Sequence, residues 1–512
     1  MTVRFGAGSP GRTPHRSSWP RRARGQALVL AIVALLVLCL GVIVLFNTGQ
    51  AVGKKVELVN AADAAAYSTA VQQARAYNLI AYMNRASVAN EVAVAQMVSW
   101  YSWMNYTYRG TDNFKDAVQA IAIIFDVSIV GAEVGAALQE VVTALNEVKT
   151  AVKEIRDGMQ VAFSTATTVI AGLNEAYSLA SRTIATADPF ERLKIARDIV
   201  SQNTDGKASI GARGDALLAK DVGDAIAFTH YYSDFDRPNA GADRYANVVM
   251  EARDGFSRER DGGIGPLHKR GGTDLVDYRH WVGMDTLNVK VGFPIFINVP
   301  MAWGGAAAVQ ESWHQSFRST ANPGFNRGRG WDSPYQTDRG HYQRYAGALD
   351  NGKASSKALS SPAMDGNDKA FIRDYAPGNP GLRPYEDIDT DKAVVPYDEG
   401  DDTDRVGPVF TVLVEQPMKT VHTANNVPGI GGTPDFEAPD KAVADDMTAL
   451  STAQVYFSRP RSLFPNLVDS RRELGNLFSP YWQARLIDTP CLVRQEVAVS
   501  YGAVAPCVPS KH

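Results

Sequence analysis

An unbroken apolar run near the start of the chain limits where the rest of the protein can lie. From Ala27 to Phe46, 20 consecutive residues carry no charged or strongly polar side chain. A helix of that length spans about 30 Å, the thickness of the hydrocarbon core of a bilayer. The apolar region of a secretory signal peptide is only about 7–15 residues long. The length favours a permanent membrane anchor over a cleaved signal peptide, although residues 49–51 have the small-x-small form of a cleavage site.

The charges that flank this run predict its orientation. Residues 1–24 contain six arginines and no acidic residue. Under the positive-inside rule this segment stays in the cytoplasm, and the residues after Phe46 cross the membrane. Lys54 and Lys55 on the far side oppose this orientation but are outnumbered. Because residues 1–24 are also rich in Pro, Gly and Ser, we predict a disordered basic tail there.

Charge and cysteine content narrow the class of protein. The 512 residues carry a formal net charge of −3, so we expect no nucleic-acid partner. Of three cysteines, Cys39 lies in the apolar run, and Cys491 and Cys507 lie in the predicted exported part. An oxidising compartment favours a disulfide between Cys491 and Cys507, with two free buried thiols as the alternative.

The residues after the apolar run predict a long helix. Residues 47–103 contain no proline and mix Ala, Val and Leu with polar residues, so the membrane helix should continue as an amphipathic helix. Near its end, Trp100, Trp103 and Tyr106 fall on one helical face. Packing in a core is the default interpretation of that face, and a partner surface is the alternative.

A heptad pattern follows, within residues 111–205. Every seventh residue from Val134 to Ala176 is apolar, and so is every seventh residue from Leu138 to Ala180. Fourteen such positions over seven heptads indicate a coiled-coil or helical-hairpin seam. We expect antiparallel pairing with the preceding helix through a short loop near Arg109–Asp112, while pairing with another chain stays open.

The composition changes after residue 205, where Gly, Pro and Asp become frequent and period-2 patterns appear. Residues 289–299 alternate and predict one strand, edge or bulged because of Pro294. Residues 409–422 and 495–501 are also predicted as strands. The fold class is therefore α+β, with a single N-terminal transmembrane helix, a long helical or coiled-coil stalk and an irregular α+β extracytoplasmic domain. The expected boundaries are 1–24 for the tail, 25–110 for the transmembrane and amphipathic helix, 111–205 for the heptad region and 206–512 for the loop-rich domain.

The motifs of common catalytic sites are missing from the sequence. It has no nucleophile elbow, zinc-protease, P-loop or dinucleotide-binding pattern, and its histidines are scattered. We therefore predict a protein that is not an enzyme, with no catalytic, cofactor-binding or metal-binding residues. Residues 386–404 hold nine carboxylates against one lysine, but Lys392 stands where a calcium loop needs glycine. A solvated acidic loop is the favoured interpretation over a calcium site.

One tract combines arginines with aromatic residues. Residues 313–345 interleave five arginines with seven aromatics and include Arg327, Arg329 and Trp331. Such side chains can stack on a sugar polymer or on a partner protein. Packing within the domain uses the same contacts and is the favoured interpretation.

The beginning of the chain resembles a known family. The run "RGQALVLAIVALLVL" followed by "NAADAAA" at residues 60–66 resembles the N-terminal domain of TadE/TadG-like Flp pilus-assembly proteins, over about residues 21–75. Residues 453–486 are also similar to a segment of longer bacterial relatives. Two features depart from the family. Leu30 replaces the Glu that prepilin peptidases favour five residues after the glycine, here Gly25, and no von Willebrand A domain is visible.

The resemblance implies a single-pass inner-membrane component of the tight-adherence (Tad) system, which builds Flp-type pili for adhesion. The N-terminus would be cytoplasmic and the bulk periplasmic. The expected partners are other Tad/Flp assembly proteins, the lipid bilayer through residues 27–46, and further copies through the helices. We expect a structural or assembly role. The alternatives are a membrane-tethered module that binds an envelope polymer and, less favoured, an anchored hydrolase.

Overall fold

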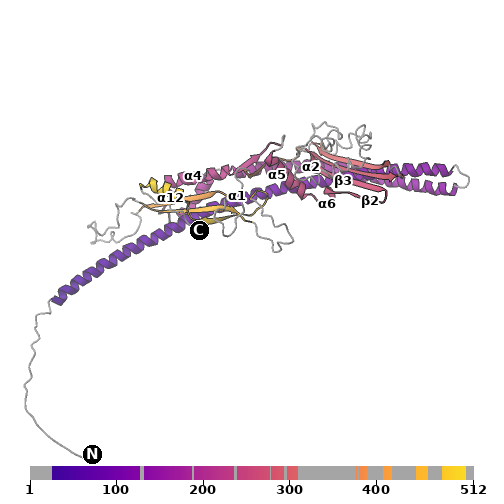
Figure 1. The fold of residues 1–512 in the computed structure, drawn as a ribbon. Coiled ribbons are helices and arrows are strands. Elements are labelled where there is room, and N and C mark those ends of the chain that lie inside the picture. The colour runs from indigo at the N-terminus through magenta and orange to yellow at the C-terminus, as the bar shows by residue number, and fades with distance from the viewer. Residues whose placement is uncertain are drawn as a thin grey trace, which may run out of the picture.

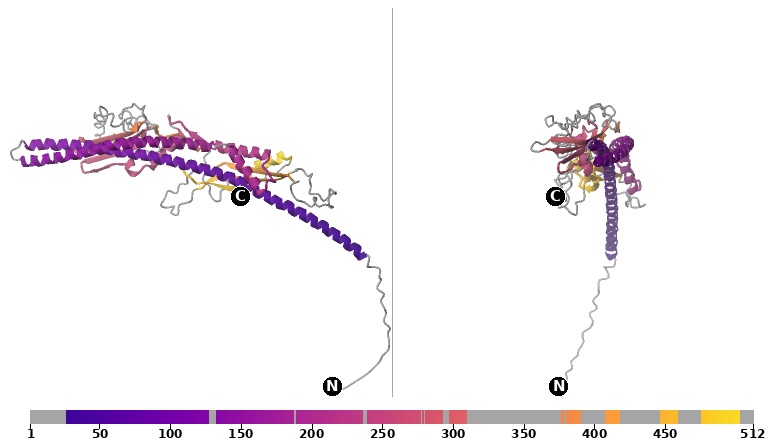
Figure 2. Two further views of the ribbon diagram at one scale, coloured as in Figure 1. Left: turned by 180° about the vertical axis from the view of Figure 1, so that it is seen from behind. Right: turned by 90° about the vertical axis from the view of Figure 1, so that its right-hand side faces the viewer.

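A single helix forms the axis of the protein. The computed structural model describes residues 26–126, 132–186, 189–235, 239–276, 278, 280–292, 297–309, 376–377, 380–389, 407–417, 446–458 and 475–502. Helix α1 (Gln26–Asp126) is 101 residues long. Its first part projects alone from the rest of the molecule, and the other elements are arranged along the remainder (Figures 1 and 2). These other elements, together with the part of α1 that they contact, form the body of the protein.

The second long helix, α2 (Ala132–Ala185), returns along α1. The two helices are antiparallel, because Gln119 hydrogen-bonds Gln139, Asp112 pairs with Lys149, and Asn90 hydrogen-bonds Asn174. Figure 2 shows them side by side up to the far end of the molecule. The expected intramolecular antiparallel pairing is therefore observed. The predicted seam was half wrong, because the series from Val134 to Ala176 is exposed, while the series from Leu138 to Ala180 is mostly half-buried.

The position expected for the turn between the two helices was wrong. Helix α1 runs without interruption through Arg109–Asp112 and ends at Asp126. Gly110 lies within this helical stretch and permits close packing, since a Cβ there would lie 3.0 Å from the Cβ of Ala302. Asp112 is held in the helix pair by Lys149 at 2.6 Å.

The body contains three β-sheets and several shorter helices. The helices are α3 (Pro189–Asn203), α4 (Ala212–Ala227), α5 (Ala240–Ala252), α6 (Gly255–Arg258) and α12 (Cys491–Ser500). The strands are β1 (Thr229–Tyr232), β2 (Gly262–Ile264), β3 (Leu267–Val276), β4 (His280–Val291), β5 (Ile297–Val309), β6 (Ala376–Pro377), β7 (Tyr385–Ile388), β8 (Val409–Pro417), β9 (Asp446–Phe457) and β10 (Trp482–Ile487). The sheet orders are β1-β7, β10-β9-β8 and β2-β3-β4-β5-β6, with every pair antiparallel except β5-β6.

Helix α1 contributes to two successive hydrophobic cores. The first extends along α1 from Leu58 to Ile80 and includes α3, α4 and the β10-β9-β8 sheet. The second extends from Val88 to Tyr101 and includes α5 and the β3-β4-β5 part of the five-stranded sheet. Both sheets thus pack on one helix, one beyond the other (Figure 1). The predicted α+β class with one long apolar N-terminal helix is confirmed.

The strand predicted over residues 289–299 was wrong, because this stretch is a hairpin. Strand β4 ends at Val291 and β5 begins at Ile297, and these two residues pair with each other. Gly292 has a φ of 110°, a conformation that favours glycine, so the chain can leave the sheet there. The alternating apolar residues lie on both strands, where Val289 pairs with Val299 across the hairpin.

The other two predicted strands had different outcomes. The first nine residues of 409–422 form β8, and residues 418–422 lie outside the described residues. Residues 495–501 were wrongly predicted as a strand, since Cys491–Ser500 is helix α12. A short apolar stretch does not by itself distinguish strand from helix. Here Pro490 immediately precedes the first helical turn, where its fixed φ suits a helix start.

Candidate functional site: the membrane helix and its attachment to the body

The first part of α1 has the properties of a membrane anchor. It is the one helix among the described residues that is long and apolar enough to cross a bilayer, and none of its most apolar window is buried by the protein. Leu30, Leu35 and Leu45 are each more than 60% exposed. An uncovered apolar surface of this length is stable in lipid and unfavourable in water.

The body begins a few turns beyond this segment. Leu58 is the first fully buried side chain of α1, and the Lys55 ammonium donates a hydrogen bond to the Thr448 carbonyl at the start of β9. From Phe46 to Leu58 the helix rises about 18 Å at 1.5 Å per residue. The body therefore lies close to the end of the apolar segment, and the two are joined by continuous helix.

The small residues of the "NAADAAA" segment form the base of this attachment. Ala61, Ala62, Ala65 and Ala66 are all fully buried. Alanine side chains allow α3 and the β10-β9-β8 sheet to approach the α1 backbone closely, and this contact is part of the first core. The segment that carried the family resemblance is thus the part of α1 on which the body packs.

This packing predicts the effect of a larger side chain. Ala66→Leu should lower the free energy of unfolding by about 1–3 kcal/mol, because added methylenes in a filled core force its neighbours apart. Ala64→Leu is the matched control, since Ala64 is only partly buried on the same turn. Denaturant titration of the full chain in detergent, followed by tryptophan fluorescence, measures both. Equal stability of the two variants would contradict the packing described.

Asparagines on α1 bind the backbone of the body. Asn78 both donates to the Trp482 carbonyl and accepts from the Trp482 N–H, at 2.9 and 3.0 Å. Asn84 donates to the carbonyls of Glu386 and Leu477, and Asn105 donates to that of Gly305 at 2.7 Å. Asparagine is a weak helix former, so its recurrence along a long helix is a sequence signal for such contacts, although the apolar pattern alone does not reveal it.

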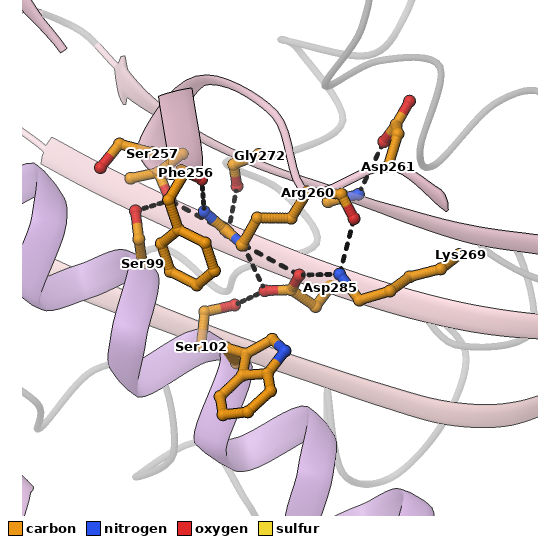
Figure 3. A network of polar contacts seen from close by, with 12 residues as sticks. Ser99, Ser102, Phe256, Ser257, Arg260, Asp261, Lys269, Gly272 and Asp285 are labelled. Atoms are coloured by element: carbon orange, nitrogen blue, oxygen red, sulfur yellow. Dashed lines mark hydrogen bonds and ion pairs between the residues drawn. The ribbon is translucent and has the colours of Figure 1, made fainter. Parts of the chain in front are cut away.

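A buried ionic network fixes the five-stranded sheet to α1 (Figure 3). Asp285 on β4 is fully buried and accepts from Arg260 Nε at 2.9 Å, from Lys269 Nζ at 3.1 Å and from Ser102 Oγ of α1 at 2.8 Å. Arg260 also donates to the Gly272 carbonyl at 2.9 Å. The buried charges of Arg260 and Asp285 are therefore paired inside the protein, as buried charges must be.

A second buried carboxylate joins α1, α2 and β4. Glu91 on α1 accepts from the indole N–H of Trp281 at 2.8 Å and from Asn174 Nδ2 at 2.9 Å. Burial raises the pKa of the Glu91 carboxyl above its ordinary value. Trp281 is the largest fully buried side chain among the described residues and belongs to the second core, so this contact lies within that core.

The start of the acidic segment is buried rather than solvated. Glu386 is 4% exposed, and Asp387 is fully buried on β7. Asp387 accepts from Arg244 at 2.5 Å and from the Leu477 N–H at 2.7 Å, so its oxygens already have partners. The expectation of a solvated loop was therefore wrong for these two residues, because they lie on β7, which pairs with β1 and contacts α1 and α2. Residues 390–404 lie outside the described residues, and so does most of the calcium pattern.

Glu386 predicts a pH dependence of stability. Burial raises the pKa of its carboxyl from about 4.5 to about 7. The folded state then holds the proton of Glu386 more tightly than the unfolded state. The stability that this proton contributes is therefore fully present below pH 4.5 and is lost as the pH rises through 7. The loss is about 3 kcal/mol at most.

Glu386→Gln should remove this dependence, because glutamine does not titrate. The free energy of unfolding of the variant, relative to the unmodified protein, should rise between pH 5 and pH 8 by about 3 kcal/mol at most. Denaturant titrations in detergent at those two pH values measure the difference. A pH-independent difference between the two proteins would contradict the raised pKa.

Of the five residues predicted as a possible partner surface, the structure describes Trp100 and Trp103. Trp100 is 41% exposed, stacks on Phe256 of α6 at 4.6 Å, and contacts Trp103 edge-on at 5.9 Å. Trp103 is partly buried. Arg327, Arg329 and Trp331 lie outside the described residues. The alternative of a partner surface at Trp100 and Trp103 thus stays a prediction.

Two of the three cysteines lie in the described residues. Cys39 in the apolar part of α1 is free and exposed, whereas Cys491 at the start of α12 is disulfide-bonded. Cys507 lies outside the described residues, so its pairing with Cys491 stays a prediction. Within the described parts of the chain, no group of three His, Cys, Asp or Glu side chains converges on a point where a metal could bind.

Comparison with known proteins gives a family match for the first part of α1. Residues 25–73 match the family described as putative Flp pilus-assembly TadE/G-like. The match covers the apolar segment and the buried alanines, and ends just before Asn78. No curated protein and no solved structure matches the chain.

Proposed function

We propose that this protein is a membrane-anchored structural component of a Tad pilus or secretion machine, because residues 25–73 match the TadE/G-like Flp pilus-assembly family. It acts through protein–protein contacts and is not an enzyme. Residues 27–46 span the inner membrane with the N-terminus in the cytoplasm, and the body lies in the periplasm. Its partners are other Tad/Flp assembly proteins.

The observation that carries this proposal is the continuity of α1. One helix is the apolar segment, the base on which the first core packs and one half of the antiparallel pair with α2. A body fixed so rigidly to its anchor is suited to holding partners at a set height above the membrane. Two buried carboxylates, Asp285 and Glu91, are used in the attachment of the body to α1.

Deletion of the gene tests the proposal. Pili and surface attachment should be lost and should return with the unmodified gene in trans. The matched variant is Leu35→Asp with Leu38→Asp, which removes the anchor and leaves the sequence of the body unchanged. It should fail to restore pili. Normal pili in the deletion strain would refute the assembly role.

A further inference from the structure

The outward face of α2 carries an apolar stripe. It consists of every seventh residue from Val134 to Ala176 and every seventh residue from Ala137 to Leu179. All fourteen are exposed, and only Thr165 among them has a polar side chain. Val148 and Ile155 are 49% and 55% exposed. The series from Leu138 to Ala180, in contrast, is mostly half-buried. An amphipathic helix that packs on α1 needs one apolar face, and α2 has a second.

The spacing of the stripe indicates what covers it. Its residues are alternately three and four apart, a period of 3.5, which is the repeat of helices that wrap around one another. One row is mainly Val and Ile, and the other is mainly Ala and Gly. A Cβ at Gly158 or Gly172 would meet nothing within 4 Å. The face is therefore open and allows a second helix to approach closely.

We propose that the stripe is the seam of a parallel homodimer, in which α2 packs against α2 of a second copy. The stripe is about 68 Å long at 1.5 Å per residue, and a helix with its side chains is about 11 Å across, so a helix packed along the stripe covers about 750 Å² on each partner. A stable interface of standard size buries about 800 Å² per partner. A two-fold axis along the seam places each residue beside its own counterpart.

Charge beside the stripe favours the parallel direction. Glu133, Glu140, Glu147 and Glu154 are exposed along one edge only. In a parallel pair the glutamate edge of each α2 faces the opposite, apolar edge of the partner's α2. In an antiparallel pair the two glutamate edges face each other, and carboxylates would oppose carboxylates. The parallel direction also rests on the proposed anchoring, since copies held in one membrane by α1 point the same way.

Cysteine cross-linking in native membranes tests the seam. The full chain carries Cys39→Ala together with Val148→Cys, and the matched control carries Thr150→Cys, which is exposed on α2 outside the stripe. Mild oxidation should join two Val148→Cys chains into a species of twice 55.4 kDa, and the Thr150→Cys control should stay monomeric. A cross-link to a different protein, or none, would overturn the homodimer.

Charge insertion gives a second readout that does not depend on oxidation. Ala144→Glu with Val148→Glu should weaken self-association in detergent by at least about tenfold, because the seam would bury unpaired carboxylates. Thr143→Glu with Thr150→Glu is the control. Sedimentation equilibrium measures the association, and circular dichroism shows that the helices persist. Unchanged association refutes the seam, whereas loss of the protein from the membrane fraction would instead refute the proposed anchoring.

Discussion

The double substitution Leu35→Asp with Leu38→Asp should remove the protein from the membrane. Each carboxylate near the centre of a span costs about 2.5–3.5 kcal/mol, so the pair costs about 5–7 kcal/mol. Both leucines are more than 60% exposed on α1, so no contact within the protein compensates. The variant should disappear from carbonate-washed membranes and appear in the soluble fraction or be degraded.

Alanine at the same two positions is the control, because it keeps the helix and leaves the segment apolar. That variant should remain in the washed membranes. If the Asp variant remained there in the same amount as the unmodified protein, residues 27–46 would not be the anchor. Immunoblotting of both fractions measures the result.

Asp285→Ala should produce the second largest effect, through the buried ionic network. It leaves the Arg260 guanidinium, whose side chain is 1% exposed, without its carboxylate partner. Removing one partner of a buried pair costs about 3–5 kcal/mol. The five-stranded sheet should lose its connection to Ser102 of α1, so its strands should become sensitive to protease at temperatures at which the unmodified protein is resistant.

Glu496→Ala is the control, because it removes an exposed pair with Lys220 at 4.0 Å. Exposed pairs contribute at most about 1 kcal/mol. Limited proteolysis and denaturant titration of the full chain in detergent compare the two variants. If Asp285→Ala were no less stable than Glu496→Ala, the network would not hold the sheet on the helix.

Much of the helical architecture could be predicted from the sequence. Twenty apolar residues followed by a proline-free segment specify one long helix, and the heptads specify a helix pair. The face that pairs could not be predicted, because the series from Val134 and from Leu138 are both apolar. Only the structure shows that the second is half-buried while the first is exposed.

The attachment of the body was harder to predict. Its contacts join residues that are far apart in the chain, such as Asn78 with Trp482 and Ser102 with Asp285. No local pattern encodes such pairs. The hairpin within residues 289–299 was missed for a related reason, because period-2 alternation is the same in one long strand and in two paired strands. The positive φ of Gly292 is what separates them.

Protease accessibility in spheroplasts tests the central claim most directly, namely that α1 anchors the chain with the body outside the cytoplasm. The chain carries one epitope at each terminus. External protease should remove the C-terminal epitope from intact spheroplasts, and the N-terminal epitope should survive until the cells are lysed. A C-terminal epitope that survives in intact spheroplasts and is cleaved only after lysis would contradict the account.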